Sequence, residues 1–307
     1  MRTKRYKIII FMAVLIIAQS LFSESFDLVI MKTDGTVIRK ATTEIDNITF
    51  SGDLTNMVVL AKDASSTSTP KADIESVVFQ ETGTVTDIDG NTYKTIKIGD
   101  QWWMAENLKT TKYKDGTPIP NITDATAWKE LSAGAYCHYD NNVSYAETYG
   151  ALYNWFAVNG DTDGNGTKDK EIAPEGWHVP TDAEWKELEM FLGMSQSTAD
   201  IAGWRGTEIQ SAKLRSTSGW DNDRNATDGN GTNEVGFAAF PGGERNNNNS
   251  YFAKTGIRAA FWTASESGDA DAWRRLIDIQ EDGAIGVYRG PGSRNYGYSL
   301  RCVKDSD

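Results

Sequence analysis

The segment His178–Trp185 reads His-Val-Pro-Thr-Asp-Ala-Glu-Trp, and it constrains the fold more than any other part of the chain. Thr181, followed three residues later by Glu184, is the capping-box pattern, in which both side chains satisfy backbone groups at the start of a helix. Apolar residues then recur at helical spacing up to Gly193, a typical helix-ending residue; they are Trp185, Leu188 and the pair Phe191 and Leu192. The segment predicts a capped helix with a tryptophan on its buried side.

Short strands and turns surround this helix in the sequence. Asp89-Gly90 between alternating residues predicts a tight hairpin, and Asp124 can cap a short helix that carries Trp128. Residues 145–157 predict a second helix, with a strand as the alternative because tyrosines are frequent there. The last strands are expected at residues 260–263, 272–277, 285–288 and 299–304.

A change of composition predicts a domain boundary near residue 83. All ten tryptophans lie between Trp102 and Trp273. Before the boundary, the run Glu44–Phe50 recurs as Asp73–Phe79, and a strand-like run precedes each copy. We interpret residues 25–80 as a small β domain with two repeats that pack together, and residues 84–305 as a larger domain.

The first 23 residues have the pattern of an export signal. Basic residues come first, an apolar run covers residues 8–17, and small residues follow. The alternative is a membrane anchor, but a span needs about 20 apolar residues. We expect a signal peptide at residues 1–23, no membrane span after its cleavage, and a periplasmic, cell-surface or extracellular protein.

Charge and cysteine count narrow the partners and the covalent structure. The formal net charge is -12, which argues against nucleic acid because no basic patch is available to bind phosphates. The chain has two cysteines, Cys137 and Cys302. In an exported protein they are expected to form a disulfide, and the alternative is two buried free thiols.

One acidic loop has the spacing of a calcium site. Oxygen-bearing side chains at alternate positions, with a glycine for the sharp turn, are what a calcium loop needs. Ile172 stands where the closing bidentate glutamate is expected. Calcium is therefore a possible cofactor, and a solvated acidic turn is the alternative. The candidate ligands are Asp161, Asp163, Asn165, Thr167, Asp169 and Glu171.

Catalytic motifs are not evident, whereas aromatic residues suggest recognition. His178 lies between Trp177 and Val179, just before the helix cap at Thr181. A packed structural role is expected for a histidine in this position. Exposed aromatic rings stack on sugars or anchor proteins. Trp220 lies between Gly219 and Asp221, so we predict that it is exposed and stacks on a ligand.

The order of motifs resembles the Fibrobacter succinogenes major paralogous domain. The matching segments, rich in aromatic residues and glycine, are residues 101–108, 149–155, 174–180, 236–243, 261–266 and 300–303. Residues 180–185 and the Arg-Cys-Val ending are in turn similar to the formylglycine-generating, sulfatase-modifying family. That resemblance implies a C-type lectin-like fold, an α+β architecture with short twisted strands, two or three helices and long loops. It does not imply the oxidase activity, because those enzymes use a close pair of cysteines and this chain has none.

These observations favour an exported recognition or surface-structural protein whose partner is an extracellular glycan or protein. The alternative is an enzyme, either of the formylglycine-generating type or a hydrolase that acts through carboxylates.

Overall fold

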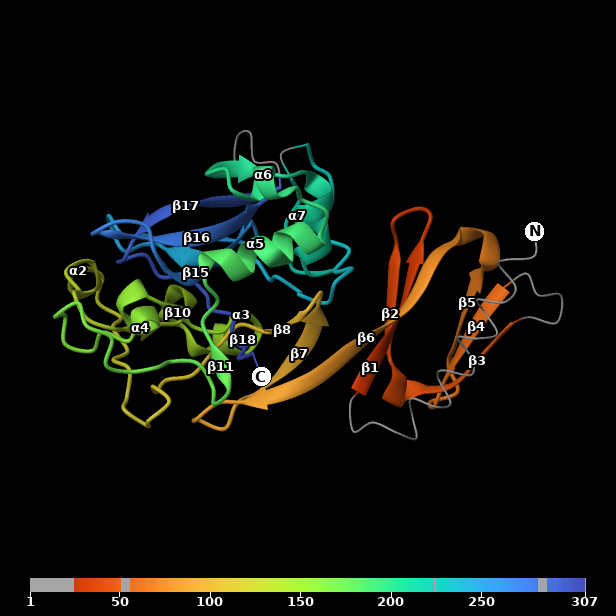
Figure 1. The fold of residues 1–307 in the computed structure, drawn as a ribbon, viewed down its shortest axis with the longest axis horizontal. Coiled ribbons are helices and arrows are strands. Elements are labelled where there is room, and N and C mark those ends of the chain that lie inside the picture. Colours follow the sequence, from red (N-terminus) through yellow and green to blue (C-terminus); the bar gives the residue numbers. More distant parts are fainter. Residues whose placement is uncertain (1–24, 51–55, 224, 281–285, 307) are drawn as a thin grey trace. The chain divides into compact units, whose positions relative to one another are not determined.

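The structure, a computed structural model, describes residues 25–50, 56–223, 225–280 and 286–306 (Figure 1). The expected signal peptide, residues 1–23, lies outside these ranges. The chain divides into two compact units. The smaller unit runs to Gly83, and the larger unit comprises Thr84–Asp307 together with Gly35–Val37.

The smaller unit is built from two copies of one strand pattern. Its strands are β1 (Ser25–Lys32), β2 (Val37–Ala41), β3 (Ile45–Phe50), β4 (Asn56–Ala61), β5 (Ser66–Pro70) and β6 (Ile74–Thr86), with 3-10 turns at Thr42–Glu44 and Lys71–Asp73. In each copy a hairpin, β1–β2 or β4–β5, is followed by a turn and a third strand.

The two copies exchange their third strands. β6, from the second copy, pairs with β1 of the first hairpin, so that Leu28 lies opposite Phe79. β3, from the first copy, pairs with β4 of the second hairpin, where Ile48 lies opposite Val59. One apolar cluster draws on both copies; its buried members are Leu28, Ile30, Ile45, Met57 and Val59. Each copy therefore supplies a strand that the other needs to complete its sheet.

The larger unit is an α+β domain. Its strands are β7 (Thr92–Ile98), β8 (Gln101–Met104), β9 (Tyr136–Cys137), β10 (Leu152–Tyr153), β11 (Trp177–His178), β12 (Gly203–Arg205), β13 (Gly242–Arg245), β14 (Phe252–Thr255), β15 (Arg258–Glu266), β16 (Asp271–Asp278), β17 (Val287–Ser293) and β18 (Val303–Lys304). Its helices are α2 (Ala125–Lys129), α3 (Ala146–Tyr149), α4 (Trp155–Asn159), α5 (Asp182–Phe191), α6 (Gln196–Ala199) and α7 (Glu208–Leu214), with 3-10 turns at Tyr139–Asn141 and Val143–Tyr145.

Three sheets organise this unit. The largest has the order β12-β17-β16-β15-β13-β14 and is antiparallel except between β13 and β15. A second sheet includes β11-β18-β8-β7, and β9 pairs with β10 alone. Helix α5 lies beside β15 and β16 in Figure 1.

The capping box predicted for α5 is confirmed. The Thr181 side chain accepts the N–H of Glu184, and the Glu184 carboxylate accepts the N–H of Thr181 at 2.8 Å. Trp185 is fully buried within an aromatic cluster, with its ring centroid 5.0 Å from that of Trp103. The expectation is wrong for Phe191, whose side chain is 58% exposed at the end of the helix. Leu192, one residue further, is buried in its place.

The single helix predicted over residues 145–157 is wrong. Gly150 interrupts it with φ +72°, and a Cβ there would lie 2.7 Å from the Asn107 Cβ and from the Leu108 carbonyl oxygen. After the break, β10 pairs with β9, and Asn154 begins α4 by accepting the N–H of Ala157 at 3.0 Å. The helical spacing of apolar residues continues through the segment, but the positive φ and close packing at Gly150 prevent one continuous helix.

The expected disulfide is also wrong, because both cysteines are free and buried. Cys302 belongs to the main core with Trp155 and Trp262, whereas Cys137 belongs to a separate cluster around Trp128. Burial raises the pKa of the Cys137 thiol to about 11 and raises that of Cys302 further. The thiols are therefore packing groups, and the fold has no covalent tie between them.

None of the helices that the structure describes is long and apolar enough to cross a membrane.

Candidate functional site

The acidic loop closes on itself through its own hydrogen bonds. The buried carboxylate of Asp161 accepts the N–H groups of Gly164 and Gly166 at 2.8 and 2.9 Å, with both glycines at positive φ. Asp163 accepts the N–H and the side-chain amide of Asn165.

The second half of the loop lacks a closing metal ligand. The carboxylate of Asp169 accepts the Thr162 hydroxyl at 2.6 Å, and Glu171 forms ion pairs with Lys114 and Lys168. Ile172 is buried. Within the described ranges, no three His, Cys, Asp or Glu side chains are grouped as metal ligands. The first half of the loop fits calcium and the closing position does not, so calcium binding stays a prediction, which calorimetric titration tests.

Trp220 is not the exposed aromatic residue that its flanking residues suggest. It is 6% exposed, and its indole N–H donates to the Ser216 hydroxyl and the Ala239 carbonyl at 3.1 and 3.0 Å. It packs with Val235 and Phe237 in the core beneath α5. The exposure predicted for Trp220 is therefore wrong, and a ring so buried offers no surface on which a ligand could stack.

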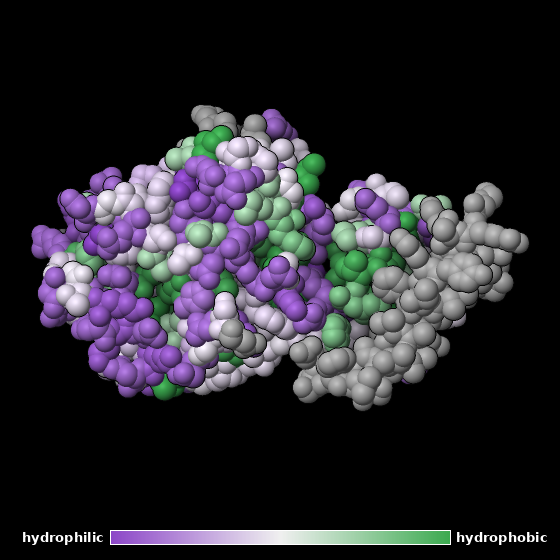
Figure 2. Space-filling model, in the orientation of Figure 1, coloured by the Kyte–Doolittle hydropathy of each residue, from purple (hydrophilic) through white to green (hydrophobic). Residues whose placement is uncertain are grey.

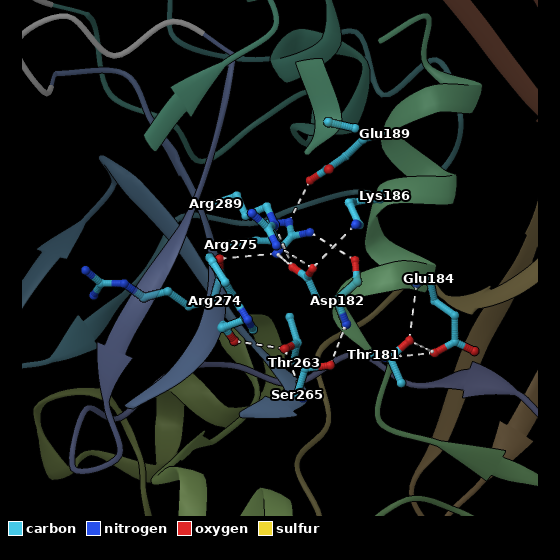
Figure 3. A network of polar contacts seen from close by, with 12 residues as sticks. Thr181, Asp182, Glu184, Lys186, Glu189, Thr263, Ser265, Arg274, Arg275 and Arg289 are labelled. Carbon is cyan, nitrogen blue, oxygen red and sulfur yellow. Dashed lines mark hydrogen bonds and ion pairs between the residues drawn. The ribbon is translucent and has the colours of Figure 1, made fainter. Parts of the chain in front are cut away.

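A buried ion network joins α5 to the large sheet (Figure 3). Arg289 donates Nε and Nη2 to the two oxygens of Asp182 at 2.9 and 2.7 Å. Arg275 bridges Asp182 and Glu189, at 2.9 and 2.7 Å, and Glu189 also pairs with Arg205. Burial alone would raise the pKa of Asp182, but the two guanidinium groups lower it. All of these charges are paired inside the fold, which makes the network a structural element.

His178 is partly exposed and lies between two carboxylates. Its Nε2 lies 2.7 Å from Glu184, and its Nδ1 lies 2.6 Å from Asp305. The hydrogen bond to Glu184 outweighs the effect of burial and, with Asp305, raises the pKa of His178 to about 9. A charged imidazole therefore links the start of α5 to the residue that follows β18.

The surface of the larger unit is mostly hydrophilic on the face drawn in Figure 2, where apolar residues form only scattered areas. A pocket that combines aromatic and polar groups is a distinct feature of such a surface.

One pocket, with a volume of about 520 Å³, has this composition. It is open to solvent, and its volume lies within the range of about 300–1,000 Å³ that is typical of small-molecule pockets. The Tyr139 and Phe252 rings lie 5.4 Å apart, and Tyr251 is 68% exposed. The lining residues are Thr123, Ala125, Tyr139, Asp140, Asn141, Arg245, Ser250, Tyr251 and Phe252.

Backbone conformation also marks this pocket. Asp140, Asn141 and Ser250 have φ of 53°, 54° and 56°, in the left-handed region that non-glycine residues seldom adopt. Such residues cluster at ligand sites, where the surrounding structure holds the backbone against its preference. The Ser250 hydroxyl is buried and has no hydrogen-bond partner, and within the described ranges no side chain or N–H group bonds the Asp140 carboxylate.

Arg245 fixes the walls of the pocket relative to each other. It is fully buried and donates to the carbonyl oxygens of Ile122, Thr123 and Ser250 at 2.6, 2.9 and 3.1 Å. Its guanidinium also lies over the Trp128 ring at 4.4 Å. Arg245 thus ties the segments around residues 123 and 250 together, and the Asn141 side-chain amide ties the segment around residue 140 to the Thr123 carbonyl at 3.1 Å. Sequence reasoning missed the pocket because three distant segments form it, although the Asn-rich run 246–249 was a visible signal.

The fold and the pocket together define an α+β domain with a small preformed cleft. The Fibrobacter succinogenes major domain matches residues 96–304, and the chain belongs to this family. No curated protein and no solved structure matches the chain.

Proposed function

We propose that the chain is an exported recognition protein that binds one or two residues of an extracellular glycan in the Tyr139–Tyr251 pocket. The observation that carries this proposal is the grouping of aromatic rings with uncommitted polar groups in one open cleft. A sugar ring presents an apolar C–H face and a hydroxyl edge, and the cleft offers a surface for each.

The chemistry of each side chain fits this role. Tyr251, Tyr139 and Phe252 provide rings on which the apolar face of a sugar can stack. The exposed Asp140 carboxylate provides acceptors for sugar hydroxyls. Because the backbone already holds these residues in place, little conformational entropy is lost on binding.

Binding is favoured over hydrolysis in this proposal. Canonical glycosidases use two carboxyl groups on either side of the scissile bond, and Asp140 is the sole carboxylate among the residues that line the pocket. A formylglycine-type oxidation is disfavoured because reactive cysteines have a lowered pKa, whereas burial raises the pKa of both thiols here.

The C-type lectin-like arrangement and export through the amino-terminal signal belong to the same proposal. The resemblance of residues 180–185 and 301–303 supports the fold, and the basic and apolar pattern of residues 1–23 supports export. Intact mass of the secreted protein tests export, because cleavage near residue 20 or 23 removes a defined mass.

Tyr251→Ala should weaken glycan binding by roughly tenfold or more, since the exposed ring is a large part of the stacking surface. A glycan array identifies the ligand, and isothermal titration calorimetry then compares the affinities of wild-type and variant proteins. The matched control is Phe191→Ala, which removes another exposed ring from the same unit. Equal affinities for wild-type protein and Tyr251→Ala, or equal weakening by both variants, would contradict the proposal.

A further inference from the structure

Arg274, which is partly buried, differs from the buried arginines of the larger unit. Arg205, Arg258, Arg275 and Arg289 all pair with carboxylates. Arg245 and Arg301 are instead bonded to several carbonyl oxygens each. In the parts of the chain that the structure describes, Arg274 has a single hydrogen bond, from Nη1 to the Tyr298 hydroxyl, and no carboxylate partner.

The guanidinium of Arg274 lies in a cage of tyrosine rings. Its central carbon is 5.5, 5.1 and 5.5 Å from the ring centroids of Tyr288, Tyr296 and Tyr298. Gly292 leaves room for it, since a Cβ there would lie 2.8 Å from the Arg274 Cδ. Figure 3 shows Arg274 pointing away from the ion network around Asp182, on the other side of the sheet.

One edge of the Arg274 guanidinium has no hydrogen-bond partner among the described residues. Nε is buried without a partner, while Nη2 has no partner in the described ranges and is not buried. The same Nε–Nη2 edge of Arg289 binds Asp182 through two parallel hydrogen bonds. This edge matches the two oxygens of a carboxylate. Tyr288 and Tyr296 are partly exposed. Because Nε is buried, binding through both nitrogens requires one of these rings to turn aside.

We propose that Arg274 and its tyrosine cage form a second binding site, which takes the carboxylate of an acidic sugar such as a uronic acid residue. The carboxylate pairs with Nε and Nη2, and the sugar ring stacks on Tyr296 or on Trp204, whose ring meets Tyr288 edge to face at 5.4 Å. The carboxylate of the ligand supplies acceptors for the two nitrogens that no described residue bonds. The site shares no residue with the Tyr139–Tyr251 pocket.

Titration calorimetry of the full chain with a uronic acid trisaccharide tests this site. A neutral trisaccharide of the same linkage and free acetate are the comparison ligands. The uronate should bind roughly tenfold or more tightly than either, and Arg274→Gln should abolish that difference. Arg274→Lys, which retains the charge and loses the planar fork, should recover only part of it. Lys304→Gln, which removes an exposed charge from the same unit, should change nothing.

Three outcomes would overturn the proposal: no binding of the uronate, equal binding by wild-type protein and Arg274→Gln, or binding of acetate as tight as that of the uronate. If circular dichroism shows that Arg274→Gln is unfolded, Tyr296→Leu takes its place and should weaken uronate binding while keeping the charge. Tyr251→Ala should leave uronate affinity unchanged, which separates failure at this site from failure at the pocket.

Discussion

At the residue scale, His178 lies between two carboxylates, that of Glu184 at the amino end of α5 and that of Asp305 after β18. Because its pKa is raised from 6.5 in the unfolded chain to about 9 in the folded protein, folding favours the protonated form. The stabilisation is complete below pH 6.5 and is lost as the pH rises through 9. Since the side chain is 37% exposed, solvent screening limits the contribution to about 1 kcal/mol.

His178→Gln should remove this pH dependence. Urea denaturation at pH 6 and at pH 10 gives the free energy of unfolding of both proteins. Between pH 6 and pH 10, the free energy of unfolding of the wild-type protein should fall by about 1 kcal/mol more than that of the variant. Other titrating groups are common to both proteins, so their effects cancel in this difference. Parallel profiles would show that the imidazole is not protonated in the folded state.

Glu189 tests the buried ion network. It is fully buried and is the carboxylate that Arg205 and Arg275 share. Glu189→Gln leaves buried guanidinium charge without compensation and should destabilise the protein by about 3–5 kcal/mol. The matched control is Glu187→Gln on the exposed face of the same helix, which should change stability by less than about 0.5 kcal/mol. Chemical denaturation measures both, and similar small losses would mean that the network is not desolvated.

At the scale of elements, the helix α5 could be predicted from the sequence because its start depends on local contacts between Thr181 and Glu184. Elements that depend on distant neighbours could not. The break at Gly150 arises from the backbone of Asn107 and Leu108, more than forty positions earlier in the chain. Trp220 is buried by residues near 237, although its immediate neighbours are polar. The pocket likewise needs three segments that no local pattern connects.

Gly150→Ala should destabilise the larger unit by more than the cost of its backbone conformation alone. The control is Gly116→Ala, where φ is also positive, at +88°, but no atom lies within 4 Å of the new Cβ. We expect about 1 kcal/mol for Gly116→Ala and at least about 2 kcal/mol for Gly150→Ala, which adds a steric clash. Thermal denaturation compares them. Equal shifts in Tm would mean that the residues around position 150 move to accommodate the new Cβ without a further loss of stability.

At the scale of the whole molecule, the fold is maintained without a covalent bond between its cysteines. Reductant should therefore leave the Tm of the protein unchanged, although an exported protein with two cysteines suggests otherwise. Alkylation followed by intact mass should modify both thiols after denaturation and neither in the folded state, because both are buried. A Tm that falls on reduction would contradict this.

The exchange of third strands in the smaller unit has a consequence for the order of folding as the chain emerges, whether from the ribosome or from an export channel. When the first hairpin emerges, the strand that completes its sheet has not yet followed, since β1 pairs with β6. Neither copy can complete its sheet before the other copy is present. The unit therefore folds only after the second copy has emerged, and a nascent chain arrested between the copies carries an open sheet edge that chaperones or other chains can bind.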